Sequence, residues 1–105
     1  MGERTENVVN GDLGETVVGL AAVIHGRRDA SPETSYTARL LQGKEDSLLK
    51  KLTEEATEVV MACKDDDHDH IRYEAGDLIY HLLVVLERYG VTTEELAGEL
   101  DARRH

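Results

Sequence analysis

Five acidic residues at helical spacing are the most informative feature of the sequence. They are Glu54, Glu55, Glu58, Glu74 and Asp77. The first three lie in the stretch LLKKLTEEATEVVMAC (48–63), and the other two lie in HIRYEAGDLIYHLLVVLERY (70–89). Carboxylate oxygens are the ligands that hard divalent cations prefer, and Mg²⁺ keeps positions open for phosphate oxygens and water. The spacing therefore predicts a metal site for Mg²⁺, with Mn²⁺ as the alternative. The substrate expected at such a site contains phosphate.

The direction of each acid follows from the turn of about 100° per residue in an α-helix. In the first stretch, measured from Leu52 on the apolar stripe, Glu55 and Glu58 lie at about −60° and −120°, whereas Glu54 lies near 200°. In the second stretch, measured from Leu78 on its apolar stripe, Glu74 and Asp77 lie at about −40° and −100°. A carboxylate at the edge of an apolar face is costly unless something pairs with it. Two helices that each carry such acids are therefore expected to share a cation.

Turn and capping signals divide the chain into helices, and no strand pattern is present. We expect one helix from an Asp12 cap to Gly26, and a short one from a Ser35 cap to Gly43. The two acidic helices follow, joined by a turn at KDDDHDH (64–70). We expect Asp46 or Ser47 to cap the first acidic helix and Gly90 to end the second. Thr92 and Glu95 are expected to form a capping box that starts a last helix. The fold prediction is all-α, with 1–105 as a single domain and 1–11 as a flexible lead-in.

Composition limits the classes of protein that the chain can represent. The formal net charge is −10, from 22 acidic and 12 basic residues, which argues against a nucleic-acid-binding surface. No apolar run approaches a membrane span, and the polar start is unlike a signal peptide, so we expect a cytoplasmic protein. The lone Cys63 lies on the apolar stripe, where we expect a small core residue. With no Trp and no Phe, the core is built from aliphatic residues, and dimerisation often completes such a core.

The acidic motif resembles that of a known enzyme superfamily. Glu54-Glu55-x-x-Glu58 followed by Glu74-x-x-Asp77 is similar to the EExxE…ExxD signature of MazG-type all-α nucleotide pyrophosphohydrolases. The segments SYTARLL (35–41), KKLTEEATEVVMA (50–62) and YEAGDLIYHLLVVL (73–86) resemble the phosphoribosyl-ATP pyrophosphohydrolase family. This resemblance implies a MazG-like helical bundle completed by a homodimer. It also implies hydrolysis of phosphoribosyl-ATP to phosphoribosyl-AMP and pyrophosphate, the second step of histidine biosynthesis.

The resemblance also implies roles for individual residues. The implied Mg²⁺ ligands are Glu55, Glu58, Glu74 and Asp77. Glu54, Glu55 and Glu58 form the implied catalytic group, in which Glu54 orients the attacking water or supports the ligands. The expected substrate contacts are Lys51, Arg39, Lys44 and His81. A role for His81 as a satisfied core histidine is about as well supported as substrate contact. His68 and His70 are weak zinc candidates, because no cysteine accompanies them in the polar turn.

Two other functions remain open from the sequence. A house-cleaning MazG-like hydrolase of ordinary or damaged nucleoside triphosphates would use the same acids. A non-enzymatic helical bundle that binds metal or a partner protein belongs to a different class. A carboxylate-bridged di-iron bundle is disfavoured, because such bundles carry Glu-x-x-His pairs and the second pair here is Glu-x-x-Asp.

Overall fold

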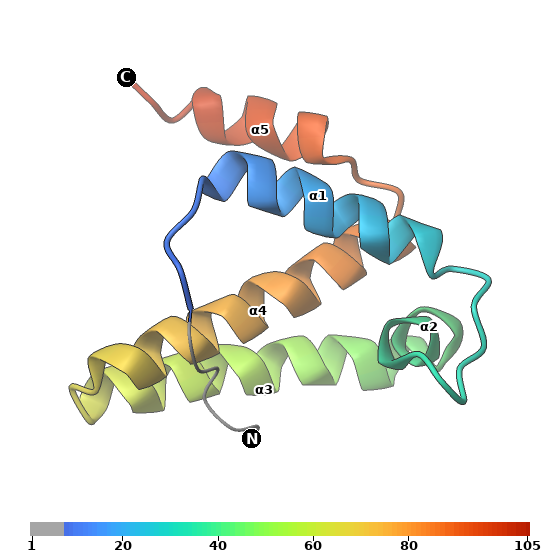
Figure 1. Ribbon diagram of the computed structural model, residues 1–105, viewed down its shortest axis with the longest axis horizontal. Coiled ribbons are helices and arrows are strands. Elements are labelled where there is room, and N and C mark those ends of the chain that lie inside the picture. The colour runs from blue at the N-terminus through green and yellow to red at the C-terminus, as the bar shows by residue number, and fades with distance from the viewer. Residues whose placement is uncertain (1–7) are drawn as a thin grey trace.

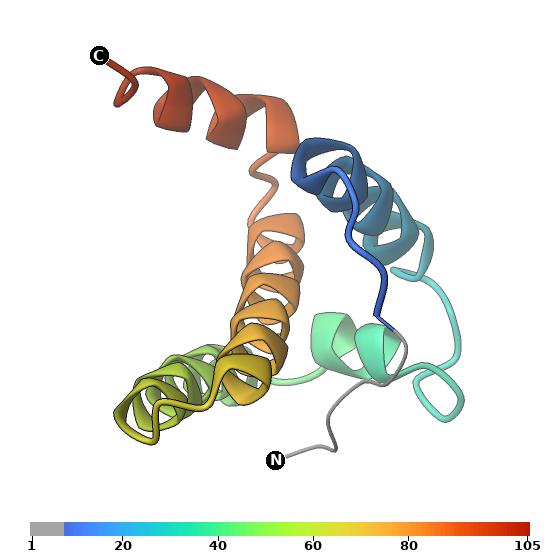
Figure 2. The same ribbon diagram turned by 60° about the vertical axis from the view of Figure 1, so that its left-hand side comes forward.

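The computed structural model describes residues 8–105, and every regular element in that range is an α-helix. The helices are α1 (Leu13–Gly26), α2 (Tyr36–Gln42), α3 (Glu45–Lys64), α4 (His68–Arg88) and α5 (Thr93–Asp101). Figure 1 shows α3 and α4 side by side as a long hairpin, with α2 next to the start of α3. Figure 2 shows α1 and α5 next to the C-terminal end of α4. The expectation of an all-α fold is confirmed.

Most of the capping signals in the sequence are confirmed by the backbone. The Asp12 carboxylate accepts a hydrogen bond from the Glu15 amide at 2.9 Å, and the Ser35 hydroxyl accepts one from the Ala38 amide. Thr92 and Glu95 form the expected capping box. Gly90 follows α4 with φ of 73°, a left-handed conformation that glycine adopts without strain. These local signals set three helix starts and one helix end.

The start of α3 differs from the expectation. The helix begins at Glu45 after Lys44, which caps it without a side-chain hydrogen bond, so the predicted cap at Asp46 or Ser47 is wrong. The end of α4 fixes this corner instead. Arg88 donates to the Gly43 carbonyl at 2.9 Å, and the Tyr89 hydroxyl donates to the Glu45 carboxylate. These contacts hold the connection between α2 and α3. They place the start of α3 at Glu45, before Asp46 and Ser47.

The turn between the acidic helices is shorter than expected. Helix α3 continues to Lys64 and α4 begins at His68, so only three residues connect them. His68 and His70 therefore lie in the first turn of α4 rather than in a loop. Asp67 caps this helix by accepting a hydrogen bond from the His70 amide at 3.2 Å. Of the predicted lead-in, residues 1–7 lie outside the described part of the chain, and residues 8–11 form no helix.

Helix α3 presents a different face to α4 from the one that its apolar stripe predicts. Its buried residues are Leu48, Glu55 and Ala62, whose mean direction is rotated by roughly 70° from the stripe. Ala56 and Cys63 of the stripe are exposed, so the prediction of Cys63 as a core residue is wrong. The acid Glu55 lies at the centre of the helix interface, while part of the apolar stripe is left at the surface.

The aliphatic core lies where α1, α3 and α4 meet. Its members are Ile24, Leu48, Leu83 and Val84. Helix α4 contributes the largest number of buried residues, as its dense apolar sequence predicts. No helix in residues 8–105 is long and apolar enough to cross a membrane.

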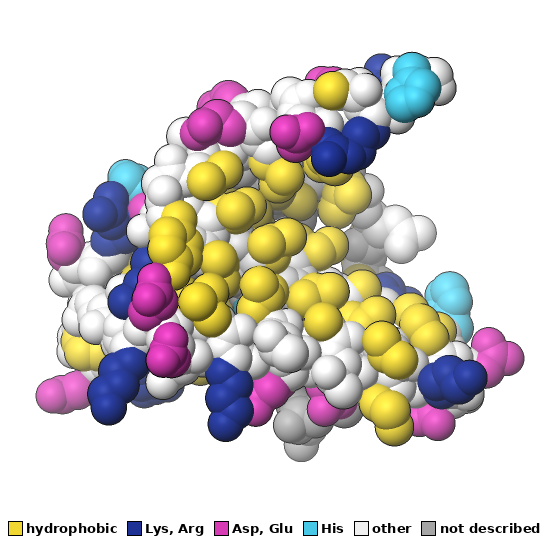
Figure 3. Space-filling view, turned by 180° about the vertical axis from the view of Figure 1, so that it is seen from behind, with side chains coloured by type: hydrophobic (Ala, Val, Ile, Leu, Met, Phe, Trp, Pro, Cys, Tyr) yellow, Lys and Arg dark blue, Asp and Glu magenta, His cyan; other side chains and the backbone are white. Residues whose placement is uncertain are grey.

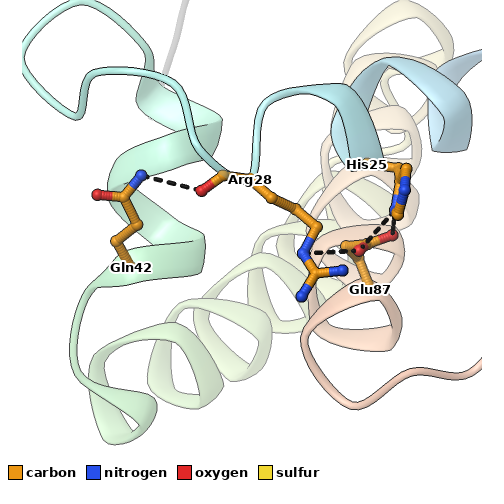
Figure 4. A network of polar contacts seen from close by, with 4 residues as sticks. All are labelled: His25, Arg28, Gln42 and Glu87. Atoms are coloured by element: carbon orange, nitrogen blue, oxygen red, sulfur yellow. Dashed lines mark hydrogen bonds and ion pairs between the residues drawn. The ribbon is translucent and has the colours of Figure 1, made fainter.

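A polar network ties the end of α1 to α2 and α4 (Figure 4). The Glu87 carboxylate accepts from Arg28 at 3.4 Å and from His25 at 3.0 Å. The Gln42 side-chain amide donates to the Arg28 carbonyl at 3.0 Å. Arg28 is therefore paired with a structural carboxylate.

We expect Asp67→Ala to lower the free energy of unfolding by about 1 kcal/mol, because α4 loses its N-terminal cap. Asp65→Ala is the matched control, since Asp65 is exposed and ends α3 through its backbone. Urea denaturation of both variants measures the difference. Equal losses in the two variants would show that the Asp67 cap does not stabilise the hairpin.

Candidate metal and substrate site

Two carboxyl groups meet between α3 and α4. Glu55 is buried and hydrogen-bonded to the side chain of Asp77, which is about one third exposed. Burial, together with the neighbouring Glu55 carboxylate, raises the pKa of Asp77 to about 6. Burial alone would raise the pKa of Glu55, but hydrogen bonds from Asp77 and Lys51 lower it below the usual value. Below about pH 6 the pair therefore shares a proton when no cation is bound, because two adjacent carboxylates repel each other.

Glu74 is the most deeply buried acid, with 0% of its surface exposed. His70 lies one turn earlier on α4, and its Nε2 donates to Glu74 Oε2 at 2.9 Å. The other oxygen, Oε1, is buried and has no hydrogen-bond partner among the described residues. The Glu74 charge also acts on Asp77 and contributes to its raised pKa. A buried carboxylate oxygen without a partner, close enough to Asp77 to act on its pKa, is suited to a cation ligand.

His81 lies beside the acids and connects them to α2. One donor atom each of Glu55, Asp77 and His81 lies within 4.8 Å of the other two. His81 Nδ1 donates to the Asp77 carbonyl at 2.8 Å, and its Nε2 is 2.9 Å from the Tyr36 hydroxyl. Since a carbonyl can only accept, the neutral ring accepts from Tyr36 at Nε2. Both ring nitrogens are thus occupied, and His81 holds α2 and α4 together.

Lys51 is next to the acids on α3. Its ammonium is 3.1 Å from Glu55 Oε1, and that hydrogen bond raises the pKa of Lys51. Tyr36 lies close enough to interact electrostatically with Lys51, and burial raises the pKa of its hydroxyl. Lys51 therefore remains a cation, and Tyr36 remains a hydrogen-bond donor, at the edge of the acidic group.

The other residues singled out from the sequence lie at different distances from this group. Glu58 is half-buried one turn after Glu55, whereas Glu54 is exposed. The Arg39 guanidinium lies over the Tyr36 ring at 5.6 Å and donates to the Pro32 carbonyl at 3.2 Å. Lys44 is exposed at the start of α3, about 10 Å along the helix axis from Lys51. Lys51 is thus the candidate cation closest to the acids.

Two residues at the site were not identified as such from the sequence. Tyr36 reaches His81 from a separate helix, which no local pattern reveals. The turn of about 100° per residue places His70 on the same helix flank as Glu74, but the only role considered for it was that of a zinc ligand. Its position was thus available from the sequence, whereas its hydrogen bond to Glu74 was not inferred.

Comparisons with known proteins agree with this geometry. Residues 17–104 match the family described as phosphoribosyl-ATP pyrophosphohydrolase. A phosphoribosyl-ATP pyrophosphatase of Methylibium petroleiphilum is 48% identical over 89 residues, covering 85% of this chain and 74% of that protein. One from Haloarcula marismortui is 42% identical over 95 residues, covering 89% of this chain and 97% of that protein.

A longer relative contains the same region. The histidine biosynthesis bifunctional protein HisIE of a Nostoc species is 44% identical over 101 residues, covering 96% of this chain and 47% of that protein. The match over residues 17–104 and the identities over most of the chain confirm the resemblance seen in the acidic motif. This chain belongs to the phosphoribosyl-ATP pyrophosphohydrolase family.

Proposed function

We propose that this chain hydrolyses phosphoribosyl-ATP to phosphoribosyl-AMP and pyrophosphate in histidine biosynthesis, with Mg²⁺ held by carboxylates of α3 and α4. The proposed ligands are Glu55, Glu58, Glu74 and Asp77. Family membership supports the reaction, and the names of the relatives from Methylibium and Haloarcula support the substrate. A biosynthetic hydrolase of this kind is expected to act in the cytoplasm as a single domain.

The state of Glu74 carries the proposal for a cation. A carboxylate that is removed from solvent is stable only when both of its oxygens have partners. Within residues 8–105, only one oxygen of Glu74 has one. His70 holds Oε2, which restrains the carboxylate and leaves Oε1 available to a cation. A hydrogen bond of this kind behind a ligand orients it and increases its affinity for metal. Oxygen ligands favour Mg²⁺ or Mn²⁺ over zinc.

The remaining residues have roles that follow from their positions. A divalent cation supplies charge neutralisation and a bound water of lowered pKa. Lys51 would move from Glu55 to a phosphate oxygen of the substrate. Glu54, exposed one residue before Glu55, would orient the attacking water from the open side. The bonded His81 ring would hold the Asp77 backbone in place rather than bind metal.

The two alternatives have less support. Each of the relatives described above is named for phosphoribosyl-ATP or histidine biosynthesis, which favours that substrate over dUTP or dCTP. Family membership favours a hydrolase over a non-enzymatic metal-binding bundle. A direct assay with all three nucleotides separates these functions.

A homodimer is also part of this proposal. Large hydrophobic side chains exposed on α1, α3 and α4 include Val18, Val23, Leu49, Val60, Met61 and Ile79. Figure 3 shows hydrophobic side chains spread almost without a break over one hollowed face of the molecule. Soluble monomers rarely expose a contiguous apolar patch of more than a few hundred Å². A second copy of the chain would cover this face and complete the small core.

We expect Glu74→Gln and Glu58→Gln to lower Mg²⁺-dependent release of pyrophosphate from phosphoribosyl-ATP by roughly 100-fold or more. Loss of a residue behind a metal ligand already costs about 10- to 100-fold, and a ligand should cost more. Glu15→Gln, an exposed acid on α1, is the control. Release from dUTP or dCTP but not from phosphoribosyl-ATP would identify a house-cleaning hydrolase instead. No release from any of the three would contradict an enzymatic function.

Stability without metal should depend on the protonation of Asp77. Its pKa is raised to about 6, so the folded protein binds more protons than the unfolded chain below that value. The contribution of Asp77 therefore favours folding at pH 5 and is lost as pH rises through about 6. Thermal unfolding in EDTA from pH 4 to 7 should show this dependence in the wild type and not in Asp77→Asn. Parallel curves for the two proteins would argue against a raised pKa.

Val60→Glu should convert a dimer to a monomer, because it places a charge on the exposed apolar stripe of α3. Ser47→Glu puts the same charge at an exposed position of α3 that lies about 140° around the helix from Val60, and it should leave the mass unchanged. Sedimentation equilibrium measures both. A wild-type protein that is monomeric at micromolar concentration would refute the dimer.

A further inference from the structure

A cavity of about 320 Å³ opens beside Asp77 on the side of α4, and the acidic group does not fill it. Its walls include Val8 from the segment before α1, and Arg72, Tyr73, Gly76 and Tyr80 from α4. This volume lies at the lower end of the range of ligand pockets, which is roughly 300–1,000 Å³. Asp77 belongs to both the cavity and the acidic group, so a ligand bound at the acids can extend into the cavity.

Gly76 is one of the residues that line the cavity. It lies in the middle of α4, where glycine is less favourable than alanine. A Cβ built at this position would have no heavy atom within 4 Å, so the packing of this chain does not require glycine there. Tyr73 and Tyr80 lie on either side of it along the helix. The result is a flat stretch of exposed backbone between two aromatic rings.

The Tyr80 ring is held in a fixed orientation. It is stacked on Tyr36 with ring centroids 6.3 Å apart, and it meets the His81 ring edge to face at 5.0 Å. The Tyr80 hydroxyl is hydrogen-bonded to Thr37. A ring fixed in this way presents a constant surface to the cavity, so that binding loses little conformational entropy.

The charges around the cavity favour an uncharged ligand group. Arg72 is paired with Asp69 at 3.3 Å on the rim, so its charge is balanced before any ligand arrives. Asp77 adds a carboxyl group, and the chain has a net charge of −10. A phosphate would be better placed near Lys51, which lies on α3. The cavity, in contrast, is built mainly from α4.

We propose that this cavity binds the purine base of the nucleotide, stacked against the tyrosine rings over Gly76. The inference rests on the proposed function, because it takes the polyphosphate to be held at the acids and Lys51. Every base has an aromatic face, and stacking on tyrosine is a common mode of base recognition. Asp77 then lies at the boundary between the phosphate-binding and base-binding parts of the site.

Binding of adenosine tests the cavity without any catalysis. The chain has four tyrosines and no other benzenoid or indole ring, so their NMR signals can be assigned. Titration of the metal-free protein with adenosine should shift the ring signals of Tyr73 and Tyr80. Tyr89, bonded to Glu45 at the far end of α4, should not shift. Gly76→Leu should abolish the shifts, since Gly76 lines the cavity and a Cβ there meets no atom of the described residues within 4 Å. Gly98→Leu is the matched control in α5, where a Cβ also meets nothing within 4 Å.

Kinetics separate this inference from the proposed function. Gly76→Leu should raise the KM for phosphoribosyl-ATP by roughly tenfold or more, the size expected for loss of base stacking. Its kcat should change little, as for a loss of uniform binding. Tyr73→Leu, which keeps apolar bulk but removes a ring, should also raise KM.

Normal wild-type turnover with an unchanged KM in Gly76→Leu would overturn the base site alone. A change of oligomeric mass in Gly76→Leu, without adenosine shifts in the wild type, would assign the cavity to a subunit interface and also overturn it. Absence of wild-type turnover would refute the proposed function, whereas adenosine binding would still test the cavity.

Discussion

Burial of acidic side chains between α3 and α4 is the constraint on which the rest of this structure depends. Glu55 and Glu74 are nearly or completely removed from solvent, and Asp77 lies between them. Removing carboxylates from water is costly unless each oxygen has a partner. Lys51, His70 and a shared proton supply some of these partners, and one oxygen of Glu74 still has none among the described residues. Packing of the central helices is therefore coupled to cation binding.

The same arrangement explains the unusual surface. When α3 turns Glu55 toward α4, it turns Ala56 and Cys63 outward. One face of α3 thus carries the acids proposed to bind a cation. The adjacent apolar face of α3 is left for contact with another surface. A second copy would bury that face, and the metal site and the proposed dimer would both result from the orientation of one helix. The rigid contacts of α2 with α4, through Tyr36 and His81, hold the acidic face in position.

Local signals predicted most of the fold and the types of residue at the site. Capping at Asp12, Ser35 and Thr92 depends on neighbours in sequence, so it can be read without a structure. The start of α3 and the link from Tyr36 to His81 depend on residues more than 40 positions away, so they cannot. The exposure of Cys63 was missed for a different reason: hydrophobic periodicity identifies an apolar face but not which partner covers it.

Crystals grown with Mn²⁺ would show directly whether Glu74 is a cation ligand. Mn²⁺ gives an anomalous signal, so its position does not depend on how the surrounding side chains are interpreted. We expect an ion between α3 and α4, bound to Oε1 of Glu74 at about 2 Å, with His70 still bonded to the other oxygen. Binding of Mn²⁺ only elsewhere, with Glu74 Oε1 still without a partner, would contradict it.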